Sequence, residues 1–220
     1  MFFSSYGTFM HDIIKKFHKK ELKKNELVSY YLLHYEEEVR GRPMSSNVYI
    51  KYFNAGLVYL KNIQEEKDEI VVCEEEFLWK IGDYRFIGFA DLITKDCNGD
   101  YKIIDNKSKD LKNRSNRKKE TLGDKELDDY LRQLYLYSSA LKSTFHCIPK
   151  YLEFNCYRTG KVITEPYVEE KHLEAEKWAI DSIEKIKKEE DWRPHLDDFS
   201  CKYICDVNHA CEYYNMNRRR

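Results

Sequence analysis

The chain has 220 residues, enough for one sizeable hydrophobic core, and its 42% hydrophobic and 15% aromatic residues exclude a disordered protein although 35% of the chain is charged. The formal net charge of −1 gives no argument for a nucleic-acid partner, but lysine and arginine gather in a few segments that could neutralise phosphates. No apolar run approaches the roughly 20 residues of a membrane span, and the first residues lack a signal-peptide pattern, so we expect a cytoplasmic protein without a membrane partner.

The first part of the chain is predicted to be helical. Residues 5–24 carry an apolar stripe with lysines on the opposite side, which is typical of an amphipathic helix. Further helices are predicted at about 25–39 and 47–66, on either side of a Gly-Arg-Pro break. Residues 1–66 are therefore expected to form a helical N-terminal part.

The middle of the chain has the pattern of β-strands. Three strands, joined by a Gly-Asp turn and an Asn-Gly turn, are predicted at 70–80, 84–95 and 101–107. Short connections of this kind favour an antiparallel meander.

The remaining elements complete an α/β pattern. After a polar, basic loop, the prediction gives a helix, two strands and a long helix, at 124–142, 150–157, 161–167 and 169–190. This order indicates one domain over 1–220, with a mixed central sheet flanked by helices and a catalytic part at 70–167. The tail at 192–220 is expected to be rich in loops and contains three cysteines.

Asp105 and Lys107 are the strongest candidates for chemistry. The pattern Asp-x-Lys occurs three times, but Asp100 follows a turn and Asp110 lies in the basic loop, whereas Asp105 and Lys107 end an apolar strand. Side chains two residues apart on a strand share a face. A carboxylate can bind a hard divalent cation there, and an ammonium group can orient water or offset charge on an attacked phosphate.

A second carboxylate is needed to hold such an ion, and the preceding strand offers Asp91. It follows an apolar run, where an unpaired buried carboxylate is costly. Across a short hairpin, Asp91 and Asp105 could approach the same ion. The alternative is a solvated strand end. One of Glu74, Glu75 and Glu76 could join the site, and the sequence does not choose among them.

Two further positions have a polar group where a site could use one. Gln133 and Tyr137 are four residues apart, on one face of a predicted helix, and could both reach a phosphate or a water; the alternative is a pair of ordinary boundary residues. His11 lies at the edge of the apolar stripe of the first helix. It could be an imidazole ligand, which would favour Mn²⁺ over Mg²⁺, or a packed histidine.

The order of these motifs resembles that of the PD-(D/E)XK nucleases, and more closely their RecB-like exonuclease branch, which includes helicase-coupled and CRISPR-adaptation nucleases. The family pattern has a His after a Gly on an early helix, then Gly-x-x-Asp, Asp/Glu-x-Lys and Gln-x-x-x-Tyr. The matching positions here are His11, Gly88 to Asp91, Asp105 to Lys107, and Gln133 to Tyr137. The resemblance covers roughly residues 7–211.

The resemblance implies a restriction-endonuclease-like core and a set of site roles. His11, Asp91 and Asp105 would bind Mn²⁺ or Mg²⁺, with the backbone carbonyl of Asn106 as a further ligand. Lys107 would act on the attacking water, and Gln133 and Tyr137 would complete the site. Phosphodiester hydrolysis needs a nucleophilic water and charge neutralisation, which a carboxylate-held divalent ion supplies.

The implied activity is metal-dependent hydrolysis of DNA at strand ends or in single strands. A helicase or another nucleic-acid-processing protein would be a fitting partner. One alternative is a catalytically silent nucleic-acid-binding module with a metal in the cysteine tail. Another is an interaction domain in which Asp105 and Lys107 form a structural ion pair. The basic loop at 108–123 is expected to be a mobile segment that attracts phosphates.

The cysteine tail is the remaining candidate site. In the RecB-like branch a similar tail supplies three ligands of a [4Fe–4S] cluster, and here Cys201, Cys205 and Cys211 would match them. The first spacing is one residue longer than usual, and no cysteine precedes His11, so the set is one ligand short. His209 could complete a zinc site instead. The fold could also recruit another cysteine (Cys73, Cys97, Cys147 or Cys156), and the alternative is three free thiols.

Overall fold

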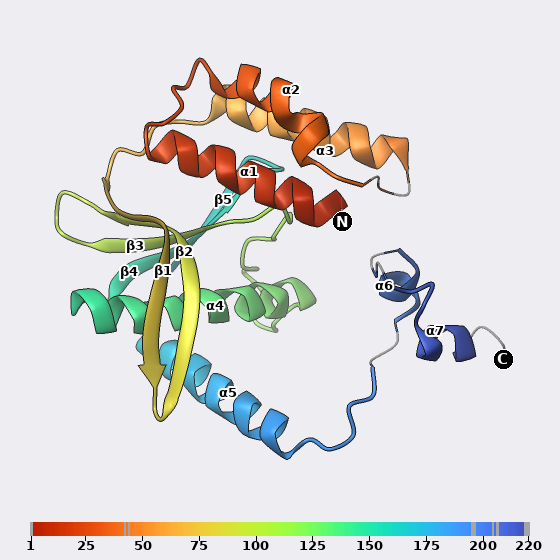
Figure 1. The fold of residues 1–220 in the computed structure, drawn as a ribbon. Helices are drawn as coiled ribbons and strands as arrows, with labels where there is room; N and C mark the ends of the chain where they lie inside the picture. Colours follow the sequence, from red (N-terminus) through yellow and green to blue (C-terminus); the bar gives the residue numbers. More distant parts are fainter. Residues whose placement is uncertain are drawn as a thin grey trace.

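The computed structural model describes residues 2–41, 43, 45–194, 197–203, 205 and 207–217. Its centre is a five-stranded sheet in the order β1-β2-β3-β4-β5, with helices on both sides (Figure 1). The strands are β1 (Glu69–Ile81), β2 (Tyr84–Lys95), β3 (Tyr101–Asn106), β4 (Pro149–Cys156) and β5 (Lys161–Pro166). The predicted α/β fold with a mixed central sheet is confirmed.

Connection lengths explain the strand directions. Short turns join β1 to β2, β2 to β3 and β4 to β5, and each of these pairs is antiparallel. β3 and β4 are parallel because the helix between them carries the chain back to the end of the sheet at which β3 begins.

Two helical layers cover the sheet, as Figure 1 shows. One layer consists of α1 (Phe2–His18), α2 (Leu27–Glu38) and α3 (Ser46–Asn62). The other consists of α4 (Leu122–Phe145) and α5 (Glu169–Lys188). Two short helices, α6 (Asp198–Tyr203) and α7 (Glu212–Asn217), lie in the tail, where little regular structure was predicted.

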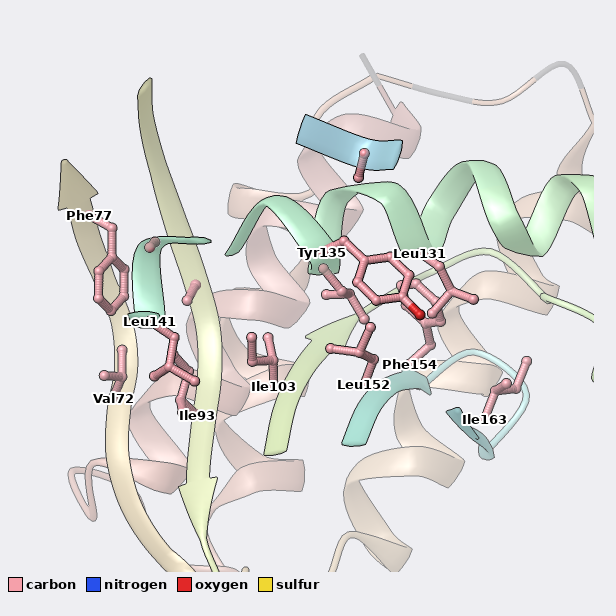
Figure 2. Packing of buried hydrophobic residues seen from close by; sticks show 14 of the residues in the cluster. Val72, Phe77, Ile93, Ile103, Leu131, Tyr135, Leu141, Leu152, Phe154 and Ile163 are labelled. Carbon is pink, nitrogen blue, oxygen red and sulfur yellow. The ribbon is translucent and has the colours of Figure 1, made fainter. Parts of the chain in front are cut away.

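The main hydrophobic core lies between the sheet and α4. Ile103 and Leu152, on the central strands, pack against Leu131, Tyr135 and Leu141 of α4 (Figure 2). These side chains are nearly fully buried. Burying one large aliphatic side chain contributes about 1.5–3 kcal/mol, so this layer fixes α4 firmly on the sheet.

The layer of α1, α2 and α3 has its own core, which is rich in tyrosine. Tyr6, Tyr31 and Tyr35 are fully buried, and Tyr31 and Phe9 stack with ring centroids 5.6 Å apart. α1 ends at His18 rather than at residue 24, because Lys20 takes a left-handed conformation with φ of 61°. No helix among the described residues is long and apolar enough to cross a membrane.

The loop between β3 and α4 is attached to the body at Arg114. Its guanidinium donates to Asp128 on α4 and, over 2.8 Å, to Glu165 on β5. Leu111 in the same loop is fully buried. Arg114 is therefore an anchor of the loop rather than a free cation, unlike the exposed side chains of Lys112, Arg117, Lys118 and Lys119.

Candidate metal centre

Three carboxylates lie on one row across three adjacent strands. β1 and β2 pair Cys73 with Leu92 and Glu75 with Ala90, so Glu74 lies opposite Asp91. β2 and β3 pair as far as Leu92 and Ile104, and the next step in that register places Asp91 opposite Asp105. Like charges opposite each other destabilise a ladder, which fits the end of the β2–β3 pairing at this row.

The backbone adapts to this crowding. Glu74 has a φ of 51°, an uncommon left-handed conformation for a residue with a side chain. The alternation of side chains along β1 also breaks near Glu74. Val72 is an odd number of residues from Phe77 and Trp79, so a regular strand would place it on the opposite side, yet it packs in the same cluster. Between β2 and β3, the backbone amide of Asn106 donates to the side chain of Asp91, at Oδ2, over 2.7 Å, and not to a backbone carbonyl of β2.

His11 reaches this row from α1. Its Nδ1 lies 3.2 Å from Glu74 Oε1 and 3.5 Å from Asp91 Oδ2. Its Nε2 lies 2.9 Å from the carbonyl oxygen of Asn106, which accepts the ring N–H. The second ring nitrogen, Nδ1, therefore points toward the two carboxylates.

Lys107 links the same row to α4. Its Nζ lies 2.7 Å from Asp105 Oδ2 and donates to Gln133 Oε1 over 3.1 Å. The amide of Gln133 donates in turn to the hydroxyl of Tyr137 over 3.2 Å. The structure thus brings Lys107, Gln133 and Tyr137 into one hydrogen-bonded series beside Asp105.

Gly88 makes room for Tyr137. A Cβ atom at position 88 would lie 2.8 Å from Cε1 of Tyr137 and 3.2 Å from the ring of Trp79. Such contacts are too short for carbon atoms, so only glycine fits at this position without a shift. The glycine of the Gly-x-x-Asp motif therefore has a packing role at the site.

Negative charge is concentrated at this site. Burial, together with the charge of Asp105, raises the pKa of Asp91 to about 7. Burial also raises the pKa of Asp105, although the ammonium group of Lys107 opposes this effect. Burial disfavours the charged imidazole of His11, but the bond to Glu74 and the charge of Asp91 raise its pKa overall. The carboxylates therefore resist full ionisation in this buried setting, and a bound cation would favour their ionised forms.

The donor set fits a hard divalent cation. Ligand atoms of His11, Glu74 and Asp91 all lie within 4.8 Å of one another, and no other group of three ligating side chains in the described residues does so. Carboxylate oxygens with one imidazole suit Mn²⁺ or Mg²⁺. Asp105 lies outside this group and pairs with Lys107. An open hollow of about 440 Å³ between α1 and β1 leads to His11 and Glu74.

Comparison with known families decides the class of protein. A family model described as the PD-(D/E)XK nuclease superfamily matches residues 3–212, which is nearly the whole chain. The chain belongs to the PD-(D/E)XK nuclease superfamily. No curated protein matches the chain significantly.

Glu74 is the site residue of this PD-(D/E)XK nuclease that the sequence prediction left undecided. The residue was named only as one of three neighbouring glutamates. Turn length would have resolved the choice, since a two-residue turn pairs Ile81 with Tyr84 and the same register reaches Glu74 and Asp91. Glu75 and Glu76 are exposed.

The predicted metal site in the cysteine tail is not formed in the part of the nuclease that the structure describes. All three thiols are free, and Cys205 is exposed. The described tail residues contain no set of three ligand atoms within 4.8 Å of one another. A [4Fe–4S] cluster or a zinc ion needs four ligands held close together, so this arrangement fits neither.

Proposed function

We propose that the protein is a nuclease of the RecB-like branch that hydrolyses DNA phosphodiester bonds with Mn²⁺ or Mg²⁺. The observation that carries the proposal is the convergence of His11, Glu74 and Asp91 beside the Asp105–Lys107 pair. Family membership gives the nuclease class, and the donor set supports a metal-dependent reaction.

His11, Glu74 and Asp91 are the proposed side-chain ligands of the ion. Nδ1 of His11 is the proposed ligand atom, because it faces Glu74 and Asp91 while Nε2 donates its proton to Asn106. The carbonyl of Asn106 orients the imidazole through this bond; because the two ring nitrogens point away from each other, it would have to give up the bond to ligate the same ion. When bound, the cation would neutralise phosphate charge and make a water more acidic. An imidazole ligand favours Mn²⁺ over Mg²⁺.

Asp105 is proposed as an additional ligand. It lies on the same row as Asp91, and its burial makes an ionised carboxylate costly without a positive neighbour. In the structure Lys107 supplies that neighbour. A bound divalent cation would also neutralise the charge of Asp105 and so weaken the ion pair between Asp105 and Lys107.

Lys107 is proposed to act on the phosphate. Asp105 and Gln133 fix the position of its ammonium group from two sides, and the ring of Tyr130 lies 5.7 Å from it. A positioned cation stabilises the negative charge that grows on an attacked phosphate. Tyr137 and Gln133 would hold this group and donate hydrogen bonds to the substrate.

Strand ends or single strands of DNA are the proposed substrate, as in the RecB-like exonucleases that the motifs resemble. A helicase that exposes such strands would be a fitting partner.

Calorimetric titration with Mn²⁺ tests the metal site directly. We expect the wild-type protein to bind Mn²⁺, and we expect Glu74→Gln and Asp91→Asn to weaken binding at least tenfold. Glu75→Gln is the matched control, because it removes one exposed charge from the same strand. Equal binding by all four proteins would contradict the assignment.

A further inference from the structure

The hairpin of β1 and β2 extends well beyond the rest of the sheet (Figure 1). β2 pairs with β3 only over Leu92–Lys95, so its first half has β1 as its one strand neighbour. One side of the hairpin packs against α4 through Phe77 and Trp79. The other side is the hairpin face, which we define as Glu76, Leu78, Lys80, Arg85, Ile87 and Phe89.

Near the metal centre, the hairpin face carries three large apolar side chains and one exposed acid, Glu76, which lies opposite Phe89. Leu78 is 70% exposed, Ile87 is 62% exposed and Phe89 is 53% exposed. Leu78 and Ile87 are direct cross-strand neighbours, and Phe89 is two residues after Ile87 on β2, toward Asp91. Three large apolar side chains exposed together on one side of a hairpin mark a binding surface more often than scattered ones do.

The far end of the hairpin face is basic. Lys80 and Arg85 are directly opposite each other and exposed. Neither forms an ion pair in the part of the chain that the structure describes. Like charges in direct opposition destabilise a strand pair, and a bound anion would offset this repulsion. A phosphate group would supply that anion.

The hairpin face leads to the metal centre. Phe89 is two residues from Asp91, and Arg85 is six residues from it. With a rise of about 3.3 Å per residue, these separations are about 7 Å and about 20 Å along the strand. On the other side of Asp91, Cys73 and Leu92 are buried, and Cys73 Sγ lies 4.0 Å from the carbonyl oxygen of Lys15 on α1. α1 thus covers this side of the hairpin as far as His11, and the hairpin face begins where that cover ends.

We propose that the hairpin face binds one unpaired nucleic-acid strand and guides it to the metal centre. A base would stack on Phe89, further bases would pack on Ile87 and Leu78, and a phosphate would bind between Lys80 and Arg85. Stacking requires a free base face, which a single strand offers and a duplex does not. The inference deepens the proposed nuclease function and rests on it for the direction of the strand.

Fluorescence anisotropy with a labelled single-stranded oligonucleotide in EDTA tests the hairpin face without cleavage. We expect Lys80→Ala/Arg85→Ala to weaken binding about tenfold and to lower the log–log salt slope by about 0.7, the value for one phosphate contact on a single strand. Phe89→Ala should weaken binding without changing the slope. The control is Lys23→Ala/Lys24→Ala, which removes two exposed charges from the segment between α1 and α2.

The two proposals fail in different ways. Affinity and salt slope that match those of the control variant would overturn the role of the hairpin face, and so would a lack of single-strand binding by the wild type. Binding that depends on the hairpin face, without any metal-dependent cleavage, would overturn the proposed nuclease function alone. A melting temperature that falls in Lys80→Ala/Arg85→Ala, or a changed oligomeric state, would assign the face to folding or self-association instead.

Discussion

Gly88 and Tyr137 are in such close contact that a single methyl group would not fit between them. A Cβ atom at position 88 would lie 2.8 Å from Cε1 of the tyrosine ring. We expect Gly88→Ala to push Tyr137 away from Gln133, to lower activity and to destabilise the fold by about 1–3 kcal/mol, as overpacking usually does. Chemical denaturation and a cleavage assay measure the two effects.

A double-mutant cycle separates this contact from a general effect of alanine on the strand. In a Tyr137→Ala background, Gly88→Ala should cost much less stability, because the ring that it displaces is gone. An equal cost in both backgrounds would show that the contact with Tyr137 does not explain the glycine.

Lys107 should matter for the rate of reaction more than for DNA affinity. Its ammonium group lies between Asp105 and Gln133. We expect Lys107→Ala to lower the single-turnover cleavage rate roughly 100-fold or more, which is the usual loss when one transition-state charge partner is removed. Lys109→Ala is the control, since Lys109 lies over the same Tyr130 ring but pairs with Glu126. Loss of affinity with an unchanged rate would make Lys107 a phosphate anchor only.

Asp124 should make the stability of the protein depend on pH in the acid range. The hydroxyl and amide groups of Ser115 and Thr121 donate to its carboxylate, which holds its pKa well below the usual value of about 3.9. The ionised group therefore stabilises the fold at pH values above about 4, and this contribution is lost as the pH falls toward the lowered pKa.

Thermal unfolding of Asp124→Asn checks this expectation. At pH 7 the variant should melt at a lower temperature than the wild type, and the difference should shrink steadily below pH 4. Asp129→Asn, on the same helix, removes a more exposed carboxylate and should show little difference at either pH. A difference between Asp124→Asn and the wild type that does not change with pH would rule out the ionised carboxylate as its cause.

Much of the site could be predicted because turn lengths fix strand register. The turns after Ile81 and after Lys95 together determine that Glu74, Asp91 and Asp105 share one row. Asp91 and Asp105 were predicted as partners on this ground. Glu74 was left undecided among three neighbouring glutamates, although the register set by the turn after Ile81 places it opposite Asp91. The left-handed conformation of Glu74 could not be predicted, because no residue type at this position signals it.

Other features depend on how distant elements meet. The partners of Arg114, Asp128 and Glu165, are distant in the sequence, and the bonds arise only because the fold brings α4 and β5 to the same loop. A basic sequence therefore could not distinguish this anchor from the exposed cations of the same loop. The spacing of the tail cysteines likewise indicates suitable ligand types but does not determine whether the thiols meet.

Cleavage of end-labelled DNA by the purified wild-type protein is the most direct test of the central claim, that His11, Glu74, Asp91 and Asp105 form a metal-dependent nuclease centre. The assay compares single- and double-stranded substrates in Mn²⁺, Mg²⁺ and EDTA, with Asp91→Asn and Asp105→Asn beside the wild type. We expect cleavage with Mn²⁺ and Mg²⁺, none in EDTA, and a loss of activity of at least 1,000-fold, or about 4 kcal/mol of transition-state stabilisation, in both variants although they remain folded. Near wild-type cleavage by either folded variant, or cleavage that persists in EDTA, would contradict the account.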